Sequence, residues 1–447
     1  IQAVARYMPE NCGGIHIHLS ELMPVLQTYG VECQVAASQD KPNEDTYTYE
    51  GISVYRYPVF PEPKPEPNHG IVSHGGFDKF AHWLKLQNAD IYHQHQWTPK
   101  CGLPHLRLAK ELGMKTVVSV RLPQPICQRK SLMLDGKTAC DGKIDLLRCS
   151  QCCGVSRSLP APIIQNLGKM PIKLSIMAGG ALRRFKDAPH LLQNTAASFL
   201  RPVSIPAFVA ARKRGLIEMA QYADRIIVMS QWVYDAMTIN GIPPEKLYLL
   251  RHGISETLIQ ERATRTRTDS HTLRIGFLGR WTKDKGIHLL VEAVKQLPAS
   301  VPIELVIHGV PQNESYRRKI MNRISEDSRI QVGKRLKREE IPFALANFDV
   351  LAVPSQWLET GPVVVLEAFS HGLPVVGSDL GGVAEKVHHN VDGLLVAAND
   401  AAAWAKAFER LALEPDLVQK LRQGIRPVRT IHQEALDTLA LYNDLIS

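Results

Sequence analysis

The sequence contains no run of apolar residues long enough to cross a bilayer, which takes ~18 consecutive residues in a helix. Its first residues, IQAVARYMP, also lack the charged start and the apolar core of a signal peptide. These two absences predict a cytoplasmic protein. The chain opens on Ile1 without a methionine, so the question whether a processed segment precedes it stays open.

Internal repeats and nucleic-acid-binding motifs are missing as well, which argues against a solenoid and against a nucleic-acid partner. The formal net charge is +9 and the isoelectric point is near 9.1. Such a charge favours anionic partners, and without a nucleic-acid motif these are nucleotide phosphates or an acidic membrane surface.

The length and composition predict a globular protein with two domains. A single hydrophobic core normally stops growing beyond ~250–300 residues, and this chain has 447. Hydrophobic residues make up 45% and charged residues 22%, which is ordinary for a globular protein and argues against disorder.

Short apolar runs alternate with longer helical patterns along the whole chain, which is typical of an α/β fold with parallel sheets. The alternation forms two series, each predicting one doubly wound sheet. The expected strands of the first series are 3–6, 32–37, 91–93, 116–120 and 225–229. Those of the second are 273–278, 304–308, 330–332, 350–353, 374–377 and 393–396, with a helix expected over 286–297.

The domain boundaries follow from a break in this alternation. Residues 256–272 are polar and charged with no apolar period, so they are predicted to link an N-terminal domain over 1–255 to a C-terminal domain over 273–430. The segment 431–447 is expected as a C-terminal helix that could pack back on the N-terminal domain. The stretch 58–70 carries five prolines and is predicted to be an exposed loop.

Three strand-to-helix junctions of the second series carry residues suited to bind phosphate. The first reads GRWTKDKG, with Arg280 and Lys285 able to clamp a diphosphate, although a basic turn is more often only exposed to solvent. The second carries Glu359, a glycine and a proline at the start of a helix, and Glu367 within that helix. The third, SDLGGVAE, is another glycine turn that opens a helix.

These motifs resemble the nucleotide-sugar site of the retaining family 4 glycosyltransferases, the glycosyl transferases group 1. The resemblance rests on GRWTKDKG and on ETGPVVVLEAFSHGLPVVGSDLGGVAEKV in the second half. In the first half, YMPENCGGIHIHLSELMPVLQTYG is similar to the glycine-rich first loop of the family, and ADIYHQHQW to its histidine motif. The resemblance implies the GT-B fold, in which two Rossmann-like domains face each other across a cleft.

The resemblance also implies a role for each matching residue. Arg280 and Lys285 would neutralise the departing diphosphate, so that no catalytic metal is needed. Glu359 would hydrogen-bond the transferred sugar, and His95 would lie beside it, although His93 competes for this role. The residues implied in donor binding are Gly13, Gly14, Gly279, Gly361, Pro362, Val363 and Glu367.

The implied activity is transfer of a sugar, with retention of its configuration, from a nucleotide sugar such as a UDP-sugar to an acceptor. The acceptor class stays open between a glycan, a lipid-linked molecule and a small molecule, and polysaccharide biosynthesis is the commonest association of the family. Two alternatives are a non-catalytic nucleotide-sugar or glycan-binding protein of the same fold, and a nucleotide-sugar epimerase. Acceptor-dependent release of nucleotide separates these alternatives from a transferase.

Five of the eight cysteines cluster in an insert near residues 127–153. Cys149 and Cys152 form a CxxC pair, preceded by Cys127 and Cys140, and this pattern predicts a structural zinc site. An iron–sulfur cluster is a less favoured alternative with the same ligands, and free thiols are the simplest one. The three other cysteines, which resemble isolated core residues, are Cys12, Cys33 and Cys101.

Residues 160–215 mix apolar stretches with basic patches. This mixture suits peripheral contact with a membrane or with a lipid-linked acceptor, and it equally suits ordinary amphipathic packing.

Overall fold

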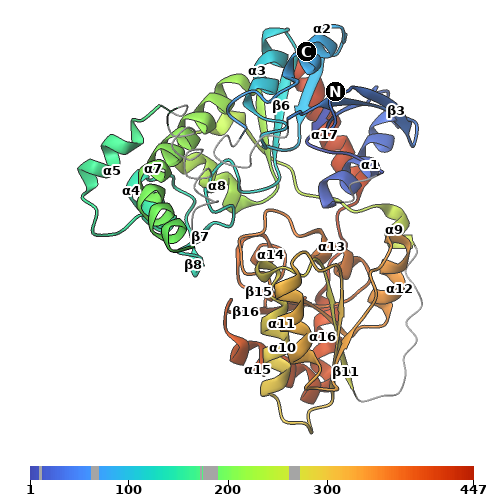
Figure 1. Ribbon diagram of the computed structural model, residues 1–447. Helices are drawn as coiled ribbons and strands as arrows, with labels where there is room; N and C mark the ends of the chain where they lie inside the picture. Colours follow the sequence, from blue (N-terminus) through green and yellow to red (C-terminus); the bar gives the residue numbers. More distant parts are fainter. Residues whose placement is uncertain (10–12, 62–69, 172–173, 175–189, 261–271) are drawn as a thin grey trace. The chain divides into compact units, whose positions relative to one another are not determined.

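The computed structural model describes residues 1–9, 13–61, 70–171, 174, 190–260 and 272–447 (Figure 1). The chain divides into two compact units. Unit 1 consists of Ile1–Leu250 and Ala435–Ser447, and unit 2 of Arg251–Glu434. The predicted linker begins with a short helix, α9 (Glu256–Gln260), and its remainder, 261–271, lies outside the described residues, as does most of the proline-rich loop.

Unit 1 is built on an eight-stranded sheet in the order β10-β9-β6-β5-β1-β2-β4-β3, parallel except for the hairpin of β3 and β4. All five strands expected for this half are present. The strands are β1 (Gln2–Val4), β2 (Gln34–Gln39), β3 (Asp45–Tyr49), β4 (Ile52–Pro58), β5 (Ile91–Gln94), β6 (Lys115–Val120), β9 (Arg225–Val228) and β10 (Leu247–Leu249).

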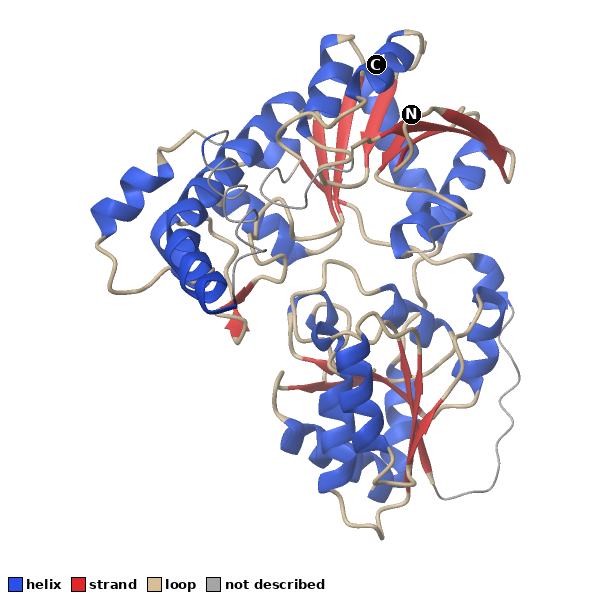
Figure 2. Cartoon of the chain, in the orientation of Figure 1, coloured by secondary structure: helices blue, strands red, loops and turns tan. Residues whose placement is uncertain are grey.

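Helices flank this sheet (Figure 2). They are α1 (Gly14–Thr28), α2 (Phe77–Lys85), α3 (Leu103–Glu111), α4 (Leu146–Cys152), α5 (Ala161–Gly168), α7 (His190–Tyr222), α8 (Gln231–Ile239), the 3₁₀ turn η2 (Pro244–Lys246) and the end of α17 (Ile431–Ile446). A small hairpin of β7 (Met133–Leu134) and β8 (Thr138–Ala139) lies in the cysteine-rich insert. Within the described ranges, no helix is both long and apolar enough to traverse a membrane.

Unit 2 contains a six-stranded sheet in the order β13-β12-β11-β14-β15-β16, in which every pairing is parallel. The strands are β11 (Leu273–Leu278), β12 (Ile303–His308), β13 (Ile330–Val332), β14 (Val350–Val353), β15 (Val375–Ser378) and β16 (Gly393–Val396). The connecting elements are η3 (Lys283–Lys285), α10 (Ile287–Gln296), α11 (Glu314–Ile324), η4 (Arg338–Glu340), α12 (Ile341–Ala346), α13 (Val363–Ser370), α14 (Gly381–Ala384), α15 (Ala401–Leu413) and α16 (Pro415–Gly424). The order is that of a doubly wound Rossmann sheet.

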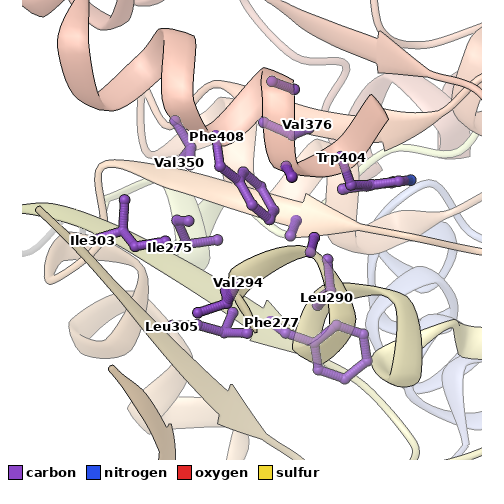
Figure 3. Close-up of a cluster of buried hydrophobic side chains, with 14 of the residues drawn as sticks. Ile275, Phe277, Leu290, Val294, Ile303, Leu305, Val350, Val376, Trp404 and Phe408 are labelled. Atoms are coloured by element: carbon purple, nitrogen blue, oxygen red, sulfur yellow. The ribbon is translucent and has the colours of Figure 1, made fainter. Parts of the chain in front are cut away.

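The strands of unit 2 are apolar because helices bury both faces of the sheet. On one face, Trp404 of α15 and Leu290 of α10 gather with Ile275 and Phe277 of β11 (Figure 3). The other face is covered by a second cluster from α12, α13 and the strands. The two buried faces make the sheet a rigid base for the loops at its carboxyl edge.

Candidate functional site

The carboxyl edge of the unit 2 sheet has a topological switch point between β11 and β14. From β11 the chain continues to β12 on one side, whereas β14 begins the other half of the sheet. Ligands of such sheets bind in the crevice at this point, outside the carboxyl ends of the strands. The loops that follow β11, β14 and β15, residues 279–286, 354–362 and 379–380, are therefore the candidate site.

Backbone hydrogen bonds join these three loops. The amide of Gln356 donates to the carbonyl of Asp284 at 2.7 Å, which ties the second loop to the first. The amide of Gly382, in the helix α14 that follows the third loop, donates to the carbonyl of Glu359 at 2.8 Å, which ties the start of this helix to the second loop. The loops thus hold one another in place.

Two glycines allow the loops to approach so closely. Gly286 has a φ of 73°, in the left-handed region, and a Cβ there would lie 1.9 Å from the carbonyl oxygen of Pro354. A Cβ at Gly382 would lie 2.6 Å from the carbonyl oxygen of Glu359. Larger residues at either position would push the loops apart.

The side chains of Glu359 and Lys285 meet within this assembly. The Nζ of Lys285 lies 2.5 Å from Oε1 of Glu359. The same oxygen accepts from the Ser355 hydroxyl at 2.6 Å and from the Trp357 indole nitrogen at 3.2 Å. Glu359 is buried, with 7% of its surface exposed. Three donors on one buried oxygen fix the position of the carboxylate.

Arg280, in contrast, is exposed, and its side chain has no hydrogen-bond or ion-pair partner in the described part of the chain. Its neighbours are anchored: the amide of Gly279 donates to His308 at 3.2 Å, and that of the buried Trp281 to Val310 at 2.9 Å. The loop is therefore fixed while the guanidinium stays free to meet a ligand. The structure does not bring it to Glu359.

Glu367 lies in the middle of α13 and forms an ion pair with Arg338 of η4. Sequence reasoning missed Arg338, because its charged surroundings, KREE, look like a solvated surface. Gly361 and Pro362 precede the helix. The sequence predicted Pro362 in the first turn of the helix, but it is the N-cap. The helix starts at Val363, so its first amides point at the loop, as in an anion site.

In unit 1, β1 and β5 are adjacent at the corresponding switch point. Gly13 is the N-cap of α1, the helix that follows β1, and Gly14 is its first residue. A Cβ on Gly14 would meet no atom within 4 Å, so packing within the described chain does not require glycine there.

His95 follows β5 directly and is fully buried. Its ring contacts that of His93 in a tilted arrangement, with centroids 3.9 Å apart, and burial holds the pKa of both imidazoles well below the usual value. Nε2 of His95 lies 2.6 Å from Oε1 of Gln2. Both histidines are therefore neutral at pH 7, and His93 is part of the same buried arrangement.

The five cysteines of the insert are half-buried free thiols. Cys149 and Cys152 share a face of α4, but no three sulfurs in the described residues lie within 4.8 Å of one another. Arg212 of α7 is buried close to Cys127 and Cys149, which act on it electrostatically. Its Nε and Nη2 donate to Oε1 of Gln128, whereas its Nη1 has no hydrogen-bond partner among the described residues.

Two further groups of predicted residues can be placed only in part. Cys33 and Cys101 are buried, as expected for core residues, whereas Cys12 lies outside the described residues. Within 160–215, residues 172–173 and 175–189 also lie outside the described residues, so the stretch considered for membrane contact is described only in part.

Comparison with known sequences gives matches over both units. A sequence model of the family described as glycosyl transferases group 1 matches residues 260–427. The D-inositol 3-phosphate glycosyltransferase of Pseudarthrobacter chlorophenolicus is 32% identical over 91% of this chain and 83% of its own length. Two other relatives match over less. The D-inositol 3-phosphate glycosyltransferase of Corynebacterium urealyticum is 34% identical over 32% of this chain. The putative colanic acid biosynthesis glycosyltransferase WcaL of Salmonella typhimurium is 30% identical over 37% of this chain. The chain spans only 35% and 42% of their lengths.

Solved structures share the fold over the whole chain. HepE of Anabaena, crystallised with UDP and glucose, has a TM-score of 0.61 at 15% identity. The match covers 98% of this chain and 99% of HepE. Sucrose-phosphate synthase of Thermosynechococcus elongatus has a TM-score of 0.62 at 17% identity, with 100% and 99% covered. These likenesses confirm the predicted α/β fold with two Rossmann-like units, the GT-B architecture.

Proposed function

Because the chain belongs to the glycosyl transferases group 1 family, we propose that it is a retaining glycosyltransferase that uses a nucleotide-sugar donor. The observation that carries the proposal is the contact between Lys285 and Glu359 at the switch point of unit 2. A cation and a carboxylate held side by side suit a donor that has a diphosphate next to a sugar. The cation binds the diphosphate leaving group, and the carboxylate binds hydroxyl groups of the sugar.

The remaining predicted residues complete this donor site. The free amides at the start of α13, around Gly361 and Val363, bind the sugar-linked phosphate. Glu367 accepts hydrogen bonds from the ribose hydroxyls, which replace part of its ion pair with Arg338. Arg280, exposed on an anchored loop, reaches the diphosphate when the donor is bound. In unit 1, Gly13 and Gly14 would supply backbone amides at the start of α1 for the donor diphosphate or the acceptor.

The reaction follows from this charge arrangement. The bond between the anomeric carbon and the donor phosphate breaks, and its electron pair passes to the phosphate oxygen. The acceptor oxygen bonds to the anomeric carbon on the same face, and its proton passes to the leaving oxygen. Glu359 already accepts from three donors, so it binds the sugar rather than attacking it. Lys285 and Arg280 supply positive charge to the leaving group, so transfer proceeds without a catalytic metal.

The choice of acceptor rests on the relatives. One is named for D-inositol 3-phosphate and another for colanic acid biosynthesis, which are a small molecule and a polysaccharide. We propose an acceptor of one of these classes or a lipid-linked glycan, met in the cytoplasm or at the membrane surface.

The test measures nucleotide release from UDP-, GDP- and ADP-sugars in the presence of EDTA, with and without candidate acceptors. We expect one donor to be consumed with acceptor present, and Glu359→Ala to abolish its turnover. Proton NMR of the product then shows whether the anomeric configuration of the donor is retained.

The control is Glu326→Ala, which removes a carboxylate paired with Lys295 on the surface of the same unit. This variant should keep the parental rate. Donor binding without turnover, with any acceptor, would instead identify a binding protein, and acceptor-independent conversion of the sugar would identify an epimerase. An inverted product would contradict retention.

We also propose that the cysteine-rich insert binds a structural zinc ion through Cys127, Cys140, Cys149 and Cys152. The thiolate set suits zinc, and a zinc–thiolate cluster is net negative, which fits the buried Arg212 guanidinium beside it. The sulfurs are too widely spaced for ligation as they lie, so this site needs its own test.

Metal analysis of the purified protein provides that test. We expect about one zinc per chain, and we expect Cys149→Ser to lose it and to lower the melting temperature. Cys33→Ala, which removes a buried thiol elsewhere in unit 1, should keep the zinc. A folded protein without zinc would rule out the zinc site, and iron with visible absorbance would replace it with an iron–sulfur cluster.

A further inference from the structure

A chain of hydrogen bonds connects the last helix of the protein to His95 inside unit 1. The hydroxyl of Tyr442 in α17 lies 2.6 Å from Nδ1 of His93 and accepts from Nε2 of Gln2 at 3.2 Å. Oε1 of Gln2 in turn lies 2.6 Å from Nε2 of His95. At the other end, Nε2 of His93 lies 2.8 Å from the Ser119 hydroxyl. All five side chains are buried, with at most 4% of their surface exposed.

The register of the sheet explains why these side chains meet. Gln2 of β1 pairs with His93 of β5, so both project from one face, and His95 projects from the same face two residues later. Ser119 of β6 lies beside them on this face. Figure 1 shows α17 beside the N-terminal strands, where Tyr442 contacts the polar group.

The direction of each hydrogen bond follows from the Gln2 amide. Its Oε1 can only accept, so Nε2 of His95 carries the proton and Nδ1 is left as a bare acceptor. Its Nε2 donates to the Tyr442 oxygen, so the Tyr442 proton points to Nδ1 of His93. His93 then carries its proton on Nε2 and donates to Ser119. One amide therefore determines the tautomer of both histidines.

Nδ1 of His95 has no hydrogen-bond partner in the described part of the chain, although it is fully buried. A buried acceptor without a donor is unfavourable, which points to a donor supplied by a ligand. We infer that Gln2 and Tyr442 are positioning residues that hold His95 in the tautomer whose Nδ1 accepts a hydrogen bond from a hydroxyl group of the bound sugar. The identity of this ligand rests on the proposed function, whereas the tautomer does not.

Tyr442→Phe tests the inference, since it removes the hydroxyl and keeps the ring. Long-range proton–nitrogen NMR of ¹⁵N-histidine-labelled protein distinguishes protonated from bare ring nitrogens. We expect a bare Nδ1 on His95 in the parent protein and a mixture of tautomers in Tyr442→Phe. The variant should also lose about five- to tenfold in kcat/KM. This is the loss expected when one hydrogen bond no longer selects the His95 tautomer with a bare Nδ1.

Tyr234→Phe is the matched control, because this tyrosine lies on α8 outside the hydrogen-bonded chain. It should leave the His95 signals and kcat/KM unchanged. Ser119→Ala, a smaller change, should shift the His93 signals in the same way if Tyr442→Phe does not fold. A proton on Nδ1 of His95 in the parent, or unchanged signals in a folded Tyr442→Phe, overturns the inference. The spectra decide this even if no donor is turned over, so the two proposals fail separately.

Discussion

Replacing Lys285 with methionine is expected to lower kcat for sugar transfer by about 100- to 1,000-fold. The ammonium group is held 2.5 Å from Glu359 and 5.7 Å from the centre of the Trp357 ring before any ligand arrives. A charge positioned in advance needs no reorganisation as negative charge develops on the leaving diphosphate. Methionine has a similar length without the charge. Steady-state rates of nucleotide release, with the donor identified by the panel, measure the effect.

Two variants show whether charge at this position is the cause. Lys285→Arg keeps the charge but replaces a compact ammonium with a planar guanidinium, so we expect an intermediate rate. Lys295→Met removes a surface lysine paired with Glu326 in the same unit and should leave kcat within about twofold. If Lys285→Met retained most of the parental kcat while raising KM, Lys285 would bind the donor without stabilising the transition state.

Much of unit 2 could be predicted from the sequence because its strands are apolar on both faces. The ranges expected for β11, β13, β14 and β16 are those observed. For β14 and β16, which read VLAV and GLLV, a continuous apolar run between turns leaves little freedom. The loops of the candidate site follow directly from these strand ends. Only small corrections were needed, such as the N-cap position of Pro362.

The edge of unit 1 was harder to predict. The hairpin of β3 and β4 was not expected, because β3 reads DTYTY and is largely exposed at the sheet edge. In the sequence only Gly51 indicates a turn here. The positive φ of both Glu50 and Gly51, which is typical of a two-residue hairpin turn, is seen only in the structure.

The partners of the predicted site residues could not be found from sequence patterns. Tyr442 lies 349 positions from His93 and 440 from Gln2, and neither spacing leaves a local signature. Likewise, Arg338 sits in a charged stretch that a solvated surface would also show. Patterns locate strands and loops, but side chains brought together by the sheet and by a returning helix require the structure.

Acid is expected to destabilise unit 1 by about 3 kcal/mol between pH 6.5 and pH 5.5. His93, His95 and His105 are buried, and desolvation holds the pKa of each well below 6.5. In the unfolded chain they titrate near 6.5, so below that pH the unfolded state binds more protons and stability falls. Each neutral histidine contributes about 1 kcal/mol over this interval, because the unfolded imidazole is about half protonated at pH 6.5 and mostly protonated at pH 5.5. The nearby charge of Arg121 lowers the pKa of His95 further.

Hydrogen exchange at pH 7.5 and 5.5, followed by mass spectrometry, can assign this loss to unit 1. Peptides containing β5 should lose protection at the lower pH far more than peptides containing β11. His105→Gln should weaken the pH dependence of the urea midpoint, because it removes one of the buried neutral imidazoles. His82→Gln, on the exposed side of α2, should not change it. A parental pH dependence in His105→Gln would mean that other groups cause the acid sensitivity, because the buried imidazole would then contribute nothing to it.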